Sequence, residues 1–169
     1  MVETCEQNVK ERKNPMTNRE KEAKPAVKKL LRKDEDQLYK ELAMRKKTLK
    51  QDPSMADSFD LTVKFDIAAM GPMDELRDFG QELFNEYIVA AHKLFCGKET
   101  ADNEDREKLK AALGLGDAAL AAVLASLLVG YGVMAAALAA VVAAILIKRF
   151  AHTTYEVFCK AWTKNLPEG

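Results

Sequence analysis

Two pairs of histidine and cysteine are the residues best suited to chemistry in this sequence. His92 and Cys96 are four residues apart in one helical pattern, and His152 and Cys159 are seven apart in another. Residues at either spacing share one face of a helix. Two such helices side by side would offer two nitrogens and two sulfurs to a zinc ion. The spacing follows no familiar zinc finger or ribbon, so half-buried structural side chains are the alternative, and we expect no metal and no other cofactor.

A row of carboxylates and a pair of glycines are weaker candidates. The carboxylate row is typical of the charged outer face of an amphipathic helix, and no opposing ligand helix is evident. Gly114-Leu115-Gly116 resembles part of a phosphate-binding loop but lacks a third glycine and a Lys-Ser or Lys-Thr, so a corner between helices explains it. Because the chain also lacks a Gly-x-Ser-x-Gly motif, we expect no catalytic residue and no enzyme activity. The carboxylate row comprises Asp74, Glu75, Asp78, Glu82 and Glu86.

The charges balance over the whole chain but not along it. Lys plus Arg and Asp plus Glu each count 26 among the 169 residues. Residues 1–53 carry 15 basic and 10 acidic side chains, and residues 54–117 carry 7 basic and 14 acidic. A basic arm beside an acidic middle favours pairing within the molecule or between copies. Nucleic acid is an unlikely partner, because acidic residues are mixed into the arm and its only aromatic residue is Tyr39.

The cysteines and the N-terminal segment predict a location. Cys5, Cys96 and Cys159 make an odd number without a Cys-x-x-Cys pair, so a disulfide framework is not expected and a reducing compartment is the default. The first residues contain no apolar stretch typical of a secretory signal. We therefore expect a cytoplasmic protein, with membrane association as an open alternative.

Residues 58–67 alternate strictly between apolar and polar side chains, a pattern that no other stretch shows. A period of two predicts a strand with one buried face. A lone strand leaves its backbone hydrogen-bonding groups unpaired, so it needs the edge of another chain. An extended connector that packs on the protein's own helices is the alternative. The residues expected to contact a partner are Phe59, Leu61, Val63, Phe65 and Ile67.

An apolar block from 118 to 147 dominates the second half of the chain. It holds 30 residues, of which 12 are alanine and none is charged. Such a length is typical of a membrane span, but the central glycines divide it into arms of 12 and 15 residues, shorter than the roughly 20 needed to cross. The block therefore predicts either a tightly packed buried hairpin or a hairpin whose small residues associate in a bilayer. The residues expected to pack helices or enter a membrane are Gly130, Tyr131, Gly132, Ala136 and Ala140.

These patterns predict a mainly all-α fold, a helical bundle around an alanine-rich apolar hairpin, with one isolated strand-like segment. We expect the arm and the strand to reach away from the bundle toward other subunits. The expected function is that of a non-catalytic interaction or accessory subunit of a homo-oligomer or larger complex, with no small-molecule substrate evident. The alternative is a membrane-inserting or pore-forming protein that acts through the block 118–147. The predicted segments are a disordered or partner-ordered tail (1–24), a charged helical arm beginning at Pro25 (25–52), an extended linker (53–71) and a helical domain (72–164) with the hairpin 117–147.

Overall fold

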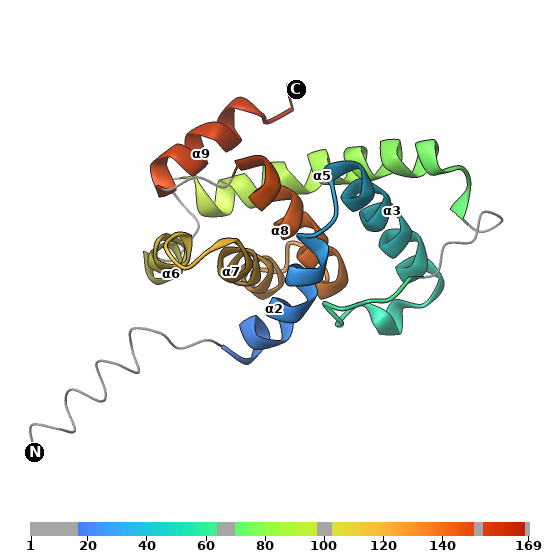
Figure 1. Cartoon of the computed structure of the whole chain (residues 1–169), viewed down its shortest axis with the longest axis horizontal. Coiled ribbons are helices and arrows are strands. Elements are labelled where there is room, and N and C mark those ends of the chain that lie inside the picture. The colour runs from blue at the N-terminus through green and yellow to red at the C-terminus, as the bar shows by residue number, and fades with distance from the viewer. Residues whose placement is uncertain (1–16, 64–69, 98–102, 151–153, 168–169) are drawn as a thin grey trace, which may run out of the picture.

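The computed structural model describes residues 17–63, 70–97, 103–150 and 154–167 (Figure 1). Its regular secondary structure in these ranges is helical throughout, which confirms the mainly α-helical prediction. The helices are α2 (Asn18–Leu30), α3 (Glu35–Gln51), the short 3-10 helix η1 (Pro53–Met55), α5 (Met73–Phe95), α6 (Asn103–Leu113), α7 (Asp117–Gly130), α8 (Ala136–Phe150) and α9 (Tyr155–Lys164).

Helix α8 lies at the centre of the molecule (Figure 1). No residue from Ala136 to Ile147 is more than 4% exposed. A helix that is apolar on every side needs neighbours on every side. Helices α7, α3 and α2 supply most of them, and α5 and α9 complete the enclosure. The apolar block is therefore the centre of the core.

Helix α7 precedes α8 and packs along it. The two are joined by the residues after Gly130, where Gly132 has a φ of 72°. A second corner precedes α7, where Gly116 has a φ of 106° and Leu115 is 62% exposed. Glycine is favoured at both positions because L-residues with a side chain rarely adopt a positive φ.

The charged segment 25–52 forms two helices, so its prediction as one helix beginning at Pro25 was wrong. The first helix begins at Asn18 because the Thr17 side chain accepts a hydrogen bond from the Glu20 backbone, and the Glu20 side chain accepts one from the Thr17 backbone. This reciprocal arrangement satisfies two of the donors that a helix start leaves free. Asp34 and Gln37 repeat it at the start of α3.

Helices α2 and α3 also do not reach away from the bundle. Helix α2 buries Ala23 and Val27 against α7 and α8. Helix α3 buries Leu38 and Leu42 between α5 and α8. The thin apolar stripe on this basic arm is sufficient for burial because small alanines on α8 let the neighbouring helices approach closely. The arm is part of the core.

The crossing of α3 and α5 depends on one glycine. A Cβ atom added to Gly80 would lie 1.9 Å from the backbone oxygen of Tyr39. The two backbones can approach this closely only where no side chain intervenes.

We expect Gly80→Ala to lower the free energy of unfolding by about 3 kcal/mol, because α5 must move away from α3 to make room. Urea denaturation followed by circular dichroism measures the loss. Gly114→Ala is the matched control, since its Cβ would lie at an ordinary 3.6 Å from the Ala111 oxygen. Equal denaturation midpoints for the two variants would contradict the close crossing.

None of the helices in the described ranges is, taken singly, long and apolar enough to cross a membrane. Helices α8 and α9 reach that length and composition only as a pair inclined at 98°.

Candidate functional site

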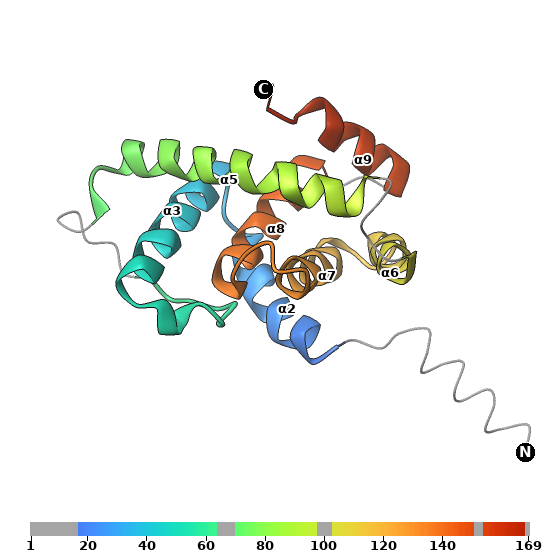
Figure 2. The ribbon, with the colours of Figure 1, turned by 180° about the vertical axis from the view of Figure 1, so that it is seen from behind.

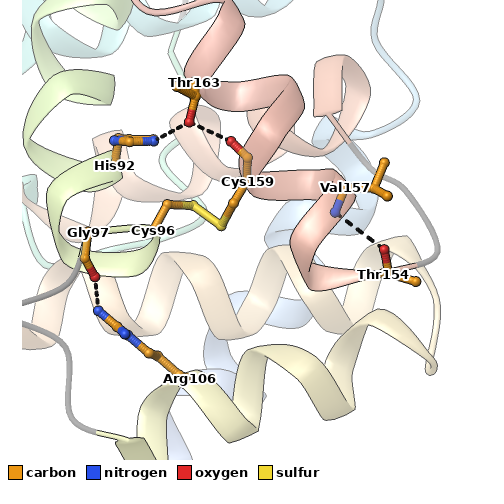
Figure 3. Close-up of a disulfide and its surroundings, with 8 residues drawn as sticks. All are labelled: His92, Cys96, Gly97, Arg106, Thr154, Val157, Cys159 and Thr163. Atoms are coloured by element: carbon orange, nitrogen blue, oxygen red, sulfur yellow. Dashed lines mark hydrogen bonds between the residues drawn. A yellow bond between two sulfur atoms is a disulfide. The ribbon is translucent and has the colours of Figure 1, made fainter.

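Cys96 and Cys159, from the two pairs singled out in the sequence, form a disulfide bond with their Cα atoms 5.6 Å apart (Figure 3). The expectation that these cysteines would stay unpaired was wrong. The bond joins the end of α5 to α9 across 63 positions of sequence. Two bonded sulfurs are not the thiolates that a zinc ion binds. In the described ranges no three His, Cys, Asp or Glu side chains are grouped to hold a metal ion, and His152 lies outside these ranges.

His92 lies one turn before Cys96 and faces α9 (Figure 3). Its Nε2 is 2.9 Å from the hydroxyl oxygen of Thr163, and that hydroxyl lies 2.8 Å from the carbonyl oxygen of Cys159. The hydroxyl has one proton and donates it to the carbonyl, so His92 Nε2–H is the donor to Thr163. Burial lowers the pKa of His92 below its usual value of 6.5. The histidine therefore connects two helices in its neutral form.

The stability of the protein should depend on the protonation of His92. The pKa of this side chain is lower in the folded chain than its value of 6.5 in the unfolded chain. The unfolded state therefore binds a proton more readily, and stability falls as the pH drops from 6.5 through the folded pKa. We expect a lower thermal midpoint at about pH 5.5 than at about pH 7.5, and a weaker pH dependence in His92→Gln. An identical pH dependence in the variant and the parent would refute this role.

Trp162 anchors α9 beside the disulfide. Its side chain is fully buried, and its ring lies 5.6 Å from that of Phe158 and 6.4 Å from that of Phe150 on α8. The rings of His92 and Phe95, both on α5, lie 5.5 and 6.4 Å away. Aromatic rings at these separations attract one another beyond their simple burial. The disulfide, the histidine and the tryptophan together hold α9 on α5 and α8.

The end of α5 is also tied to α6. The guanidinium of Arg106 donates a hydrogen bond to the carbonyl oxygen of Gly97 (Figure 3). Thr154 caps the start of α9, and its hydroxyl accepts a hydrogen bond from the backbone of Val157. These polar groups secure helix ends.

The segment 58–67 forms no strand in its described part, 58–63. Phe59 and Leu61 are buried at 4% and 5% exposure, and Phe59 packs into the main core. Val63 is half-buried beside a smaller apolar cluster, which contains Met70 and Leu76. The described part of this segment is therefore a connector without a strand, and its apolar side chains up to Val63 pack on the protein's own core. Phe65 and Ile67 lie outside the described residues.

The residues named in the apolar block fall on both sides of the turn between α7 and α8. Ala136 and Ala140 are buried in the core at 4% and 0% exposure. Tyr131 is 36% exposed, and its hydroxyl donates to the carboxylate of Asp105 on α6. A Cβ on Gly130 would lie 3.0 Å from the guanidinium of Arg19. The alanines pack helices, while the turn carries the polar contacts.

A cleft of about 860 Å³ opens beside this turn, between α6 and the start of α2. Its lining combines apolar side chains such as Phe59 and Leu127 with charged ones. Two of the charged groups pair with each other, since Lys108 Nζ lies 3.5 Å from a carboxylate oxygen of Glu20. The lining carries both signs of charge and gives no preference for one class of ligand.

Arg45 forms a buried junction that was not identified from the sequence. Its side chain is 3% exposed, and its Nε donates to the Glu41 carboxylate at 2.9 Å. Its Nη1 donates to the carbonyl oxygens of Phe59 at 2.9 Å and Ala137 at 2.8 Å. The spacing of four between Glu41 and Arg45 is a recognisable signal for a helical ion pair. Their burial is not visible in the sequence.

The comparisons with known proteins give no relative. No protein-family model, no curated protein and no solved structure matches this chain.

Proposed function

We propose that this protein is a non-catalytic helical interaction protein, an accessory subunit that assembles with other copies of itself or into a larger protein complex. The observation that carries the proposal is that the reactive side chains of this protein form structural contacts. Cys96 is bonded to Cys159, His92 is hydrogen-bonded to Thr163, and the Arg45 guanidinium is shared among three acceptors. Each of these groups connects helices.

The carboxylates of α5 support the same conclusion. All five are exposed, and the last of them, Glu86, lies six residues before His92 along the same helix. General acid–base chemistry needs its groups within hydrogen-bond reach of one substrate position. An exposed charged face is better suited to contact with another macromolecule.

Few large apolar side chains are exposed in the described part of the chain. Because Phe59 and Leu61 are buried, the accessible part of the predicted partner surface is around Val63 among the residues that the structure describes. Half-buried Met44 and Phe79 lie beside it, and Met73 is 41% exposed. This small apolar area supports contact with a partner protein, with polar groups supplying the rest of the interface.

The expected cytoplasmic location stays a prediction. The Cys96–Cys159 bond weighs against it, because disulfides persist mainly in oxidising compartments.

Light scattering on the purified full chain tests the proposal. A mass that is a multiple of 18.8 kDa, or that grows with concentration, is the expected result. A single chain of 18.8 kDa at every concentration and salt level, together with no partner recovered from its own cell extract, would refute it.

A membrane-inserting protein is the second candidate, and one observation favours it. The α7–α8 pair carries no charge from 118 to 147 and is covered by amphipathic helices. An all-round apolar helix is equally compatible with a protein core and a bilayer. If dye leaks from liposomes only when the protein is added, this candidate is favoured. Intact liposomes at the concentrations at which the chain assembles would favour the interaction protein.

A further inference from the structure

Two helices carry stripes of a single charge sign at the same spacing. The basic stripe begins on α2 and continues into the turn after it, and the acidic stripe follows α5. Successive charges in both stripes are three, four and four residues apart, which places those that lie within α2 or α5 on one face of that helix. The basic stripe is Lys21, Lys24, Lys28 and Arg32, and the acidic stripe is Glu75, Asp78, Glu82 and Glu86.

The charges of both stripes face solvent. All eight residues are exposed except Lys24, which is half-buried. Within the described part of the chain, none of the basic stripe has an ionic partner. In the acidic stripe Asp78 alone has one, its neighbour Arg77 at 3.5 Å. Like charges four apart on a helix repel one another, so each stripe is unfavourable in the isolated molecule.

The part of the basic stripe on α2 lies on the other side of α8 from the acidic stripe. Figures 1 and 2, related by a half-turn about the vertical axis, both place α5 along the upper edge and α2 below, with α8 between them, while the segment after α2 rises toward α5. Helix α2 packs against α7 and α8 and exposes its other side, while α5 packs against α3. Among the described residues, no ion pair joins the two stripes within one chain.

We propose that the basic stripe of one copy binds the acidic stripe of a second copy. The signs are complementary, the spacing is the same, and along α2 and α5 the stripes extend over roughly 10 and 16 Å of helix axis. When the two helices face each other, attraction between the opposite charges of the two copies would offset the repulsion within each stripe. The inference rests on the proposed self-association and names the surface that produces it.

The placement of the stripes determines how assembly proceeds. A contact between two different patches is heterologous, so each bound pair of copies still presents one free stripe of each sign. Assembly therefore continues head to tail into chains or rings and does not stop at a symmetric dimer. Screening weakens such exposed ion pairs, since the Debye length is about 8 Å at physiological salt and shorter above it.

Light scattering and sedimentation of the full chain at about 20 and about 500 mM salt test the interface. We expect a mass several-fold above 18.8 kDa at low salt, growing with concentration, and a single chain at high salt. The triple variant Lys21→Glu, Lys24→Glu, Lys28→Glu should stay monomeric at low salt. The second triple variant, Glu75→Lys, Glu82→Lys, Glu86→Lys, should also stay monomeric at low salt.

Charge rescue gives the specific result. Mixing the two triple variants should restore assembly, because one presents two acidic stripes and the other two basic ones. A control matched to the basic-stripe variant places the same change of net charge on exposed lysines outside the stripes and should assemble as the parent does. This control is Lys50→Glu, Lys160→Glu, Lys164→Glu, and circular dichroism establishes that each variant is folded.

Three results would overturn the inference in distinguishable ways. Assembly that is insensitive to salt and to both triple variants would place the interface elsewhere and leave the proposed self-association intact. Loss of assembly in the basic-stripe variant alone would show that the basic stripe acts on an acidic surface other than α5. A parent chain that stays monomeric at low salt would remove both the stripe interface and self-association.

Discussion

Replacing Arg45 by methionine should lower the free energy of unfolding by about 3 to 5 kcal/mol, the range measured when one partner of a buried ion pair is removed. The guanidinium is 3% exposed and connects the Glu41 carboxylate with two backbone carbonyls. One carbonyl belongs to Phe59 in the connector after η1, and the other belongs to Ala137 in the first turn of α8. Methionine fills similar space but donates no hydrogen bond, so the two carbonyls lose this donor and the buried carboxylate keeps only Lys33.

Chemical denaturation of the parent and the variant measures the loss. Lys33→Met is a matched control, because Lys33 Nζ lies 3.3 Å from the same Glu41 carboxylate while its side chain is 42% exposed. An exposed partner contributes at most about 1 kcal/mol. A second variant, Glu41→Leu with Arg45→Met, removes the buried charges together and should recover part of the stability. Equal losses in Arg45→Met and Lys33→Met would show that the junction does not stabilise the start of α8.

Removing the disulfide is the second large effect that we expect. The double variant Cys96→Ser, Cys159→Ser should lose roughly 4 kcal/mol, because the bond closes a ring across 63 positions of sequence and restricts the unfolded chain. That ring contains α6, α7 and α8 entirely. Its loss therefore frees the helix that forms the centre of the core as well as the helices beside it.

Urea denaturation with and without a dithiol reductant measures this contribution. The reductant should destabilise the parent to the level of the double variant and leave the double variant unchanged. Cys5→Ser is the control and should behave as the parent does. Titration of thiols in the denatured, unreduced parent should find one per chain, and three would contradict the bond.

Much of the local structure follows from the sequence. Leu76, Phe79 and Leu83 on α5 recur at helical spacing, and this helix begins at Met73, next to the predicted start of the helical domain at residue 72. The glycines near 115 and 131 separate α6, α7 and α8 as helix breakers do. Such signals work because a helix is specified by residues three or four apart.

The start of α2 was missed although its signal is local. Thr17 followed by Glu20 is the reciprocal cap of a helix start, but Pro25 was given more weight. Proline is favoured in the first turn and also tolerated further along where surrounding packing stabilises the helix. Burial of Ala23 and Val27 supplies that packing.

By itself, the sequence determined that the chain is mainly helical and that an uncharged alanine-rich block needs apolar surroundings, either a protein core or a bilayer. Tertiary structure alone decided that Cys96 meets Cys159, that Arg45 reaches the start of α8, and that Phe59 and Leu61 turn inward. Helix periodicity depends on neighbours within one or two turns, whereas these contacts join residues up to 92 positions apart. Such pairings depend on how helices cross, and the crossing depends on side-chain volumes that no single stretch of sequence contains.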